Sequence, residues 1–131
     1  MPQLLPIERF VDDKGSVTVL NDLEKLLPFS VKRIFFIHTL TDTVRGGHRH
    51  IKTRQAIICV QGHCTISTNN GQTKEDFNLE NSERCLIIDI NDWHAMHSFT
   101  PNTILLVLAS EAFDPDDYIR EPYKEIVDDT L

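Results

Sequence analysis

The chain has 131 residues, of which 40% are hydrophobic and 25% charged, and its formal net charge is −7. This composition is that of a globular protein, and it excludes intrinsic disorder, collagen-like repeats and a disulfide scaffold. The length predicts a single domain over residues 1–131. The acidic balance disfavours nucleic acid as a partner, because phosphate backbones are bound by basic surfaces.

A reducing, cytoplasmic location is expected. The N-terminal segment lacks the basic and apolar regions of a signal peptide, and no apolar run approaches the roughly 20 residues of a membrane-spanning helix. The chain has an odd number of cysteines, without zinc-type spacing: Cys59, Cys64 and Cys85. We therefore expect reduced core thiols and no association with a membrane.

Short strands are predicted along most of the chain, because β-branched and aromatic residues occur in brief runs between turn residues. In chain order these runs are residues 3–10, 16–20, 31–38, 54–60, 64–68, 72–79, 84–90, 93–99 and 103–110.

The segments between these runs predict turns and little helix. Residues 21–27 suit a helical turn or a loop, and residues 41–47 suit a loop in which Gly46 and Gly47 supply backbone freedom. The sequence Asn69-Asn70-Gly71 is typical of a hairpin turn. Asp114 and Pro115 are suited to begin a short C-terminal helix. The pattern as a whole favours an all-β antiparallel sandwich or jelly-roll barrel, since no amphipathic helices alternate with the strands.

Positive charge gathers in the middle of this acidic chain. Residues 32–54 contain six basic side chains against the single acid Asp42, whereas residues 111–131 contain eight acids against Arg120 and Lys124. Either both segments are solvated surfaces, or the basic segment forms a site for an anionic small molecule.

The motif most suggestive of chemistry is Gly46-Gly47-His48-Arg49-His50. Residues i and i+2 of a strand face the same side, so His48 and His50 are expected to project together and Arg49 to the opposite side. If their side is the barrel interior, two groups that titrate near neutral pH line one pocket.

The spacing of later residues resembles the metal-binding signature of cupins, with His48, His50 and a third histidine, His94. Gln55 replaces the carboxylate of that signature. A neutral amide is a poor ligand that cancels no metal charge, so no metal is expected, although three neutral histidines can bind one.

Several segments together resemble the dTDP-4-keto-6-deoxyhexose 3,4-ketoisomerases, the WxcM-like cupins of bacterial surface-sugar synthesis. The segments that carry this resemblance, in order, are residues 28–34, 45–50, 55–62, 93–94, 105–110 and 117–120. The resemblance implies a cupin double-stranded β-helix and a homodimer that acts without a cofactor on a dTDP-linked keto sugar. It also implies that His48 and His50 are the paired catalytic histidines.

The family commonly has a tyrosine where this chain has Phe35-Phe36. Any contribution of a phenol hydroxyl is therefore absent or comes from another residue. The resemblance further implies that the N-terminal segment, read as one strand from Gln3 to Phe10, pairs with the neighbouring subunit.

Moving a ketone from C4 to C3 requires removal of the C3 proton, an enediolate and reprotonation at C4. Two histidines suit this work, with one handling the carbon-bound proton and the other the oxygen-bound protons. Candidate donors to the oxyanion are Gln55, His94 and His97. The candidates for binding the pyrophosphate are the basic residues Arg33, Arg45, Lys52 and Arg54. Lys52 and Arg54 share the face of the two histidines if the strand is unbroken.

Three other functions stay open: a cupin epimerase of sugar nucleotides, a metal-dependent cupin enzyme, and a module that binds a sugar nucleotide without turning it over.

Overall fold

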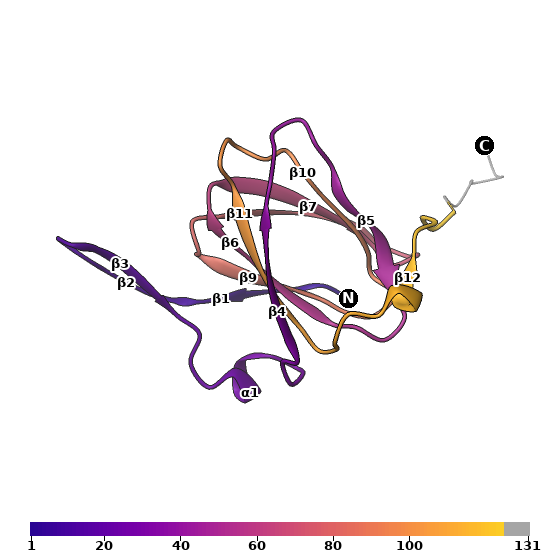
Figure 1. Ribbon diagram of the computed structural model, residues 1–131, viewed down its shortest axis with the longest axis horizontal. Helices are drawn as coiled ribbons and strands as arrows, with labels where there is room; N and C mark the ends of the chain where they lie inside the picture. The colour runs from indigo at the N-terminus through magenta and orange to yellow at the C-terminus, as the bar shows by residue number, and fades with distance from the viewer. Residues whose placement is uncertain (125–131) are drawn as a thin grey trace.

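Strands dominate the computed structural model, which describes residues 1–124 (Figure 1). They are β1 (Gln3–Pro6), β2 (Glu8–Asp12), β3 (Gly15–Val19), β4 (Arg33–His38), β5 (Arg45–His50), β6 (Gln55–Gln61), β7 (His63–Asn69), β8 (Lys74–Glu80), β9 (Arg84–Ile88), β10 (Trp93–His97), β11 (Ile104–Ala109) and β12 (Tyr118–Ile119). A short helix α1 (Leu23–Leu26) and a 3-10 turn η1 (Pro115–Asp117) complete the list.

The strands form two five-stranded antiparallel sheets and a separate hairpin. The first sheet has the order β1-β9-β6-β11-β4, the second has the order β12-β5-β10-β7-β8, and β2 pairs only with β3. Consecutive strands often lie in different sheets, so the chain crosses repeatedly between the two layers. This arrangement confirms the predicted antiparallel jelly-roll class.

Burial on both faces explains the uninterrupted apolar run of β6. Ile57 points between the two sheets, where it packs in a cluster with Leu86 and Leu105. The next residue, Ile58, points to the other face of the first sheet, into a cluster that includes Leu27 beside α1. Side chains alternate across a strand, so a strand covered on both faces has no polar positions. Leu20, Leu23 and Leu26, in and next to α1, pack against this second cluster, and Figure 1 shows α1 below β4.

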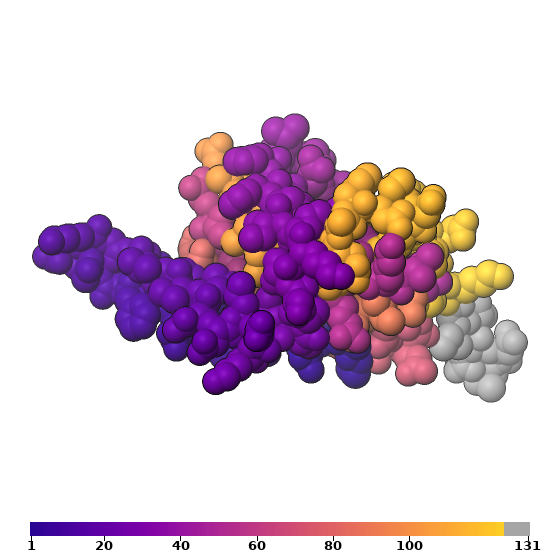
Figure 2. Space-filling model, turned by 60° about the horizontal axis from the view of Figure 1, so that its bottom comes forward, coloured from indigo at the N-terminus to yellow at the C-terminus, as the bar shows by residue number. Residues whose placement is uncertain are grey.

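The N-terminal segment departs from the expected single strand. Its first part, β1, pairs with β9 of the same chain. The second part, β2, enters the hairpin with β3, which stands out from the body of the molecule (Figures 1 and 2). Pro6 and the one-residue gap at Ile7 separate the two strands. Because proline cannot donate to a strand ladder, it suits the point where β1 ends.

The loop before β5 and the C-terminal helix both differ in extent from what the sequence predicts. The loop expected to last until Gly47 ends earlier, because β5 already begins at Arg45. The short C-terminal helix is a single 3-10 turn, and Asp114 caps it as predicted, by accepting a hydrogen bond from the backbone N–H of Asp116. Within residues 1–124, no helix has the length and apolarity to cross a bilayer.

Candidate active site

A β-bulge in β5 places the first histidine of the motif. His48 pairs with His94 of β10, but the next pair is Gly46 with Ala95, so Gly47 is the additional residue. Gly46 has a φ of +81°, and a Cβ atom there would lie 2.9 Å from the carbonyl oxygen of His94. Gly46 is therefore required for the close approach to β10 of β5, the strand that carries His48 and His50. Gly47 has open space around it and is favoured by its φ of +72°.

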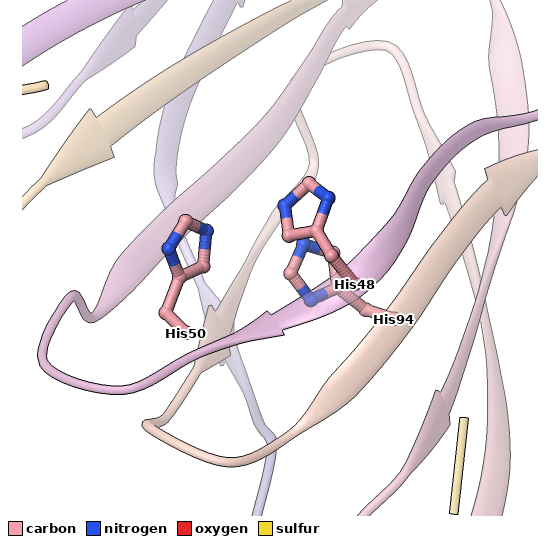
Figure 3. Close-up of side chains that lie close together, drawn as sticks. All are labelled: His48, His50 and His94. Atoms are coloured by element: carbon pink, nitrogen blue, oxygen red, sulfur yellow. The ribbon is translucent and has the colours of Figure 1, made fainter. Parts of the chain in front are cut away.

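Three imidazole rings meet between the sheets, as Figure 3 shows. The ring centroid of His48 lies 4.9 Å from that of His50 and 4.9 Å from that of His94. The predicted sharing of one face by His48 and His50 is thus confirmed. Arg49 points the other way, where its guanidinium donates to the side-chain oxygen of Asn91 and lies 4.7 Å from the ring centroid of Tyr123.

A cavity of about 140 Å³ opens beside this cluster. His48 and His94 line it, whereas the fully buried His50 lies behind its wall. The remaining lining residues combine an apolar surface with a few polar groups: Phe35, Ile37, Arg45, Gly46, Gln55, Ile57, Met96, Val107 and Tyr118. Ligand pockets commonly measure about 300–1,000 Å³, so this cavity has room for a small ring and not for a whole nucleotide sugar.

Burial keeps all three histidines neutral at pH 7. It is the main cause that lowers the pKa of His48 to about 4, with help from the nearby His50. It likewise lowers the pKa of the completely buried His94 to about 3. The pKa of His50 is also lowered by burial, although a hydrogen bond from this ring to Asp117 opposes the shift. Each ring can therefore accept a proton at neutral pH.

The hydrogen bond of His94 corrects its expected role as an oxyanion donor. Its Nδ1 lies 3.0 Å from the carbonyl oxygen of Asp92, which can only accept, so Nδ1 carries the proton. The Nε2 atom of the neutral ring then carries a lone pair and no proton. His94 can accept a hydrogen bond from a hydroxyl group in the cavity, but it cannot donate one to an oxyanion.

His97 lies outside the cavity, contrary to the expectation that it faces an oxyanion. Its Nε2 is 2.7 Å from the hydroxyl of Ser67, and its Nδ1 is 2.9 Å from the hydroxyl of Ser98. The side chains of β10 alternate between faces, and His97 is an odd number of residues from His94. It therefore points to the outer face of the second sheet.

Lys52 and Arg54 do not share the face of the histidines, because β5 ends at His50 and the chain bends at residues 51–52. The ammonium group of Lys52 pairs with Asp114 at 2.7 Å, and the guanidinium of Arg54 pairs with Asp89 at 2.9 Å. Both charges are thus balanced within the chain, away from the cavity.

Arg45 and Gln55 line the cavity, and Arg33 lies close enough for its charge to lower the pKa of His50. The Arg33 guanidinium stacks 5.0 Å from the ring centroid of Phe35 and 5.7 Å from that of Phe113, which is exposed beside it. Of the expected basic residues, Arg33 and Arg45 are therefore the two near the histidine cluster.

Sequence reasoning missed two residues that complete the site, Asp117 and Tyr118. The ring of Tyr118 lies 4.7 Å, centroid to centroid, from the rings of both His48 and His50. It brings a phenol to the cavity, whereas Phe35 contributes an apolar ring. Both missed residues follow the turn at Asp114-Pro115, but no sequence pattern shows that β12 would pair with β5.

The three imidazoles also form a group that could hold a metal ion. One nitrogen from each ring lies within 4.8 Å of the others. All three are neutral ligands, and no carboxylate among them would balance the charge of an ion.

Comparisons with known proteins agree with this geometry. Residues 2–128 match the family model described as "FdtA: WxcM-like, C-terminal". The chain is 31% identical over 120 residues to the TDP-4-oxo-6-deoxy-α-D-glucose-3,4-oxoisomerase of Aneurinibacillus thermoaerophilus, an alignment that covers 91% of this chain and 86% of that protein.

Solved structures of 3,4-ketoisomerases are also similar. The enzyme from Helicobacter canadensis has a TM-score of 0.84 and 35% identity, with coverage of 92% of this chain and 90% of that one. The WlaRB TDP-quinovose 3,4-ketoisomerase of Campylobacter jejuni has a TM-score of 0.84 and 34% identity, covering 92% of each chain. A dTDP-4-dehydrorhamnose 3,5-epimerase from Bacillus anthracis shares the fold, with a TM-score of 0.80 at 21% identity, covering 89% of this chain and 76% of that one.

Proposed function

The chain belongs to the WxcM-like family typified by FdtA, and from this premise we propose that it moves the keto group of a TDP-linked 4-keto-6-deoxyhexose between C4 and C3. The observation that carries the proposal is the neutral His48, which lines a cavity large enough for a sugar ring. A base that is unprotonated at neutral pH and faces the substrate is the first requirement of this isomerisation.

His48 acts on the carbon-bound proton, because of the two paired histidines it is the one that lines the cavity. It removes the proton from C3, and the electron pair of that bond forms the C3=C4 double bond of an enediolate. The negative charge moves to the oxygen at C4. Return of the proton to C4, with transfer of the hydroxyl proton from the C3 oxygen to the C4 oxygen, completes the isomerisation without redox change or co-reactant.

The oxyanion is stabilised by donors on the cavity wall. The amide of Gln55 lines the cavity, and the hydroxyl of Tyr118 is the phenol available there. Donors fixed before the reaction begins are most effective in a cavity that excludes water. The lone pair on Nε2 of His94 is left to accept a hydrogen bond from a sugar hydroxyl.

The nucleotide stays outside the cavity, which is too small to admit it. We expect Arg45 at the cavity and Arg33 near it to bind the pyrophosphate, because planar guanidinium groups suit its oxygens. QdtA, a 3,4-ketoisomerase with 31% identity and a TM-score of 0.85 to this chain, has been solved as a histidine-to-asparagine variant in complex with TDP-4-keto-6-deoxyglucose. That substrate is the first one to test here.

The test is incubation of the protein with TDP-4-keto-6-deoxyglucose in D₂O containing EDTA, followed by NMR of the sugar. We expect the keto group to move from C4 to C3 and deuterium to appear at C4. EDTA should not change the rate of this reaction. Deuterium uptake with the carbonyl still at C4 would indicate an epimerase. Activity that is lost in EDTA and restored by a divalent ion would indicate a metal enzyme, and binding without any product would indicate a sensor.

A homodimer is the assembly that this structure supports. The hairpin of β2 and β3 exposes Phe10, Val11 and Val17 to solvent, and the outer face of β4 exposes Ile34 and Phe36. An isolated two-stranded hairpin is at best marginally stable in water, so it needs a surface to pack on. We infer that the hairpin of each protomer packs on the other protomer, where β4 offers an apolar face.

Light scattering after gel filtration checks this inference. We expect the wild type to elute with twice the 15.1 kDa mass of the chain. Phe36→Asp is expected to shift the protein to a monomer without unfolding it, because the Phe36 side chain is 60% exposed in the protomer. Val11→Asp tests the hairpin in the same way. A monomeric wild type would contradict the inference.

The cytoplasm is the compartment in which we place this enzyme. All three cysteines are buried and unpaired. Burial raises the pKa of Cys85 to about 12, so this thiol is protonated and unreactive. Free thiols are typical of a reducing compartment, and the proposed substrate is an activated sugar used in synthesis.

A further inference from the structure

A buried carboxylate stands behind the catalytic histidines, on a segment that the proposed reaction does not otherwise use. Asp117, the last residue of η1, is 3% exposed. Its Oδ2 lies 2.9 Å from Nδ1 of His50 and also accepts from the hydroxyl of Thr53. Its Oδ1 accepts the backbone N–H groups of Ile51 at 3.1 Å and Lys52 at 2.7 Å.

These four contacts fix the protonation of both partners. Burial by itself would raise the pKa of Asp117, but the hydrogen bonds from Thr53, the Lys52 backbone and His50 outweigh it and lower that pKa. The carboxyl group is therefore ionised at neutral pH and can only accept hydrogen bonds. Because His50 is neutral, its single N–H proton must reside on Nδ1, and Nε2 carries a lone pair.

That lone pair has no partner among the described residues, although it is completely buried. Figure 3 shows the His50 ring with a nitrogen turned toward the ring of His48, whose centroid is 4.9 Å away. A buried polar atom without a partner carries a free-energy cost, and such atoms in native structures commonly mark function. Here the unpartnered atom is a proton acceptor directed at the catalytic base.

We propose that Asp117 is a positioning residue of the isomerase: it holds His50 in the Nδ1–H tautomer and balances the charge of His50 when its Nε2 takes up a proton during turnover. The proposal rests on the proposed function, which it deepens. His48 then handles the proton on carbon, and His50, which lies behind the cavity wall against the His48 ring, takes up the charge that this proton brings to the pair.

The proton balance closes within the site. When His48 takes the proton from C3, its ring holds two protons, and one of them passes to Nε2 of the adjacent His50, whose imidazolium lies against the carboxylate of Asp117. That proton returns to His48 as His48 delivers a proton to C4, which restores both neutral rings. No oxidant, reductant or further reactant is needed. Without Asp117, the buried imidazolium would have no counter-charge, which is costly in an apolar interior.

A purely structural role for Asp117 is the competing explanation, since the carboxylate also ties residues 51–53 to η1. The tautomer of His50 separates the two explanations. In Asp117→Asn the side-chain oxygen can still accept the backbone N–H groups, but the NH₂ group would face Nδ1 of His50. Nδ1 must then accept, and the proton moves to Nε2, where it blocks the base.

The experiment compares the wild type with Asp117→Asn, using ¹⁵N–¹H correlation spectra of the histidine rings together with steady-state kinetics. We expect the His50 signals to change from the Nδ1–H to the Nε2–H pattern. We also expect kcat to fall about 10³-fold while KM stays within a few-fold. The matched control is Asp116→Asn, the same chemical change at an exposed position one residue away, which should leave both readouts unchanged.

Two results would overturn the inference: an Nε2–H tautomer of His50 in the wild type, or wild-type kcat in a folded Asp117→Asn protein. A loss of kcat without a change of tautomer would also overturn it, in favour of the structural explanation. A wild type that does not isomerise the sugar would refute the proposed function alone, because the tautomer spectra do not depend on turnover.

Discussion

His48→Asn is expected to lower kcat by about three orders of magnitude while the protein stays folded and still binds the nucleotide sugar. Asparagine has nearly the size of the imidazole and can form hydrogen bonds, but it cannot take up a proton. General acid–base catalysis typically contributes about 10²- to 10⁴-fold, and His48 is the candidate base on the cavity wall. The measurement is steady-state turnover with a 4-keto-6-deoxy sugar nucleotide, together with the melting temperature.

His63→Asn serves as the matched control for this variant. His63 begins β7, whose buried residues Cys64, Ile66 and Thr68 alternate with more exposed ones. Its side chain therefore lies on the outer face of the second sheet, away from the cavity. The control should turn over at the wild-type rate. Near-wild-type kcat in His48→Asn would remove this residue from the mechanism.

The second large effect is a loss of stability in mild acid. The pKa of His94 is about 3 in the folded protein and 6.5 as the reference for the unfolded chain, mainly because its ring is buried. Between these values only the unfolded chain binds the proton. The contribution of His94 to the free energy of unfolding is therefore fully present above pH 6.5 and is lost as the pH drops toward 3. From His94 alone, this loss is about 2 kcal/mol between pH 7 and pH 5.

Urea unfolding at pH 7 and pH 5 measures this loss. His48, whose pKa is also lowered by burial, adds to it in the same direction. Asp92 acts in the opposite direction, because burial raises the pKa of its carboxyl group. The His94→Gln variant isolates the contribution of one ring: we expect a smaller difference between the two pH values, whatever the stability of the variant at pH 7. If the free energy of unfolding changed equally between pH 7 and pH 5 in the wild type and in His94→Gln, the loss could not be attributed to His94.

The strand pattern and the shared face of the two histidines could be predicted from the sequence, because both depend on local rules. The alternation of side chains along β5 brings His48 and His50 together whatever the partner strands are. The sequence Asn69-Asn70-Gly71 predicts its turn in the same local way, and the structure places it between β7 and β8. Resemblance to a known family then supplied the fold and the activity.

The remainder of the site depends on contacts between distant segments. The rule that alternate residues of a strand share a face does not extend to Lys52 and Arg54. The reason is that β5 ends at His50, where the chain bends to meet Asp117. The tautomer of His94 depends on a carbonyl group, which no pattern of side chains reveals. Asp117 and Tyr118 enter the site through the pairing of β12 with β5, a pairing of only two residues that no local periodicity indicates.

The contact between His50 and Asp117 joins positions 67 residues apart along the chain. Contacts of such long range appear late in folding, since a large loop must close before they form. The sheets depend on pairs of similar range, since Gln3 pairs with Ile87 and Ala109 with Arg33, so the sheets and the proton acceptor are expected to form together. Enzymatic turnover then reports on completion of the whole tertiary structure, and catalysis is expected to disappear along with cooperative unfolding, with no active intermediate between the two end states.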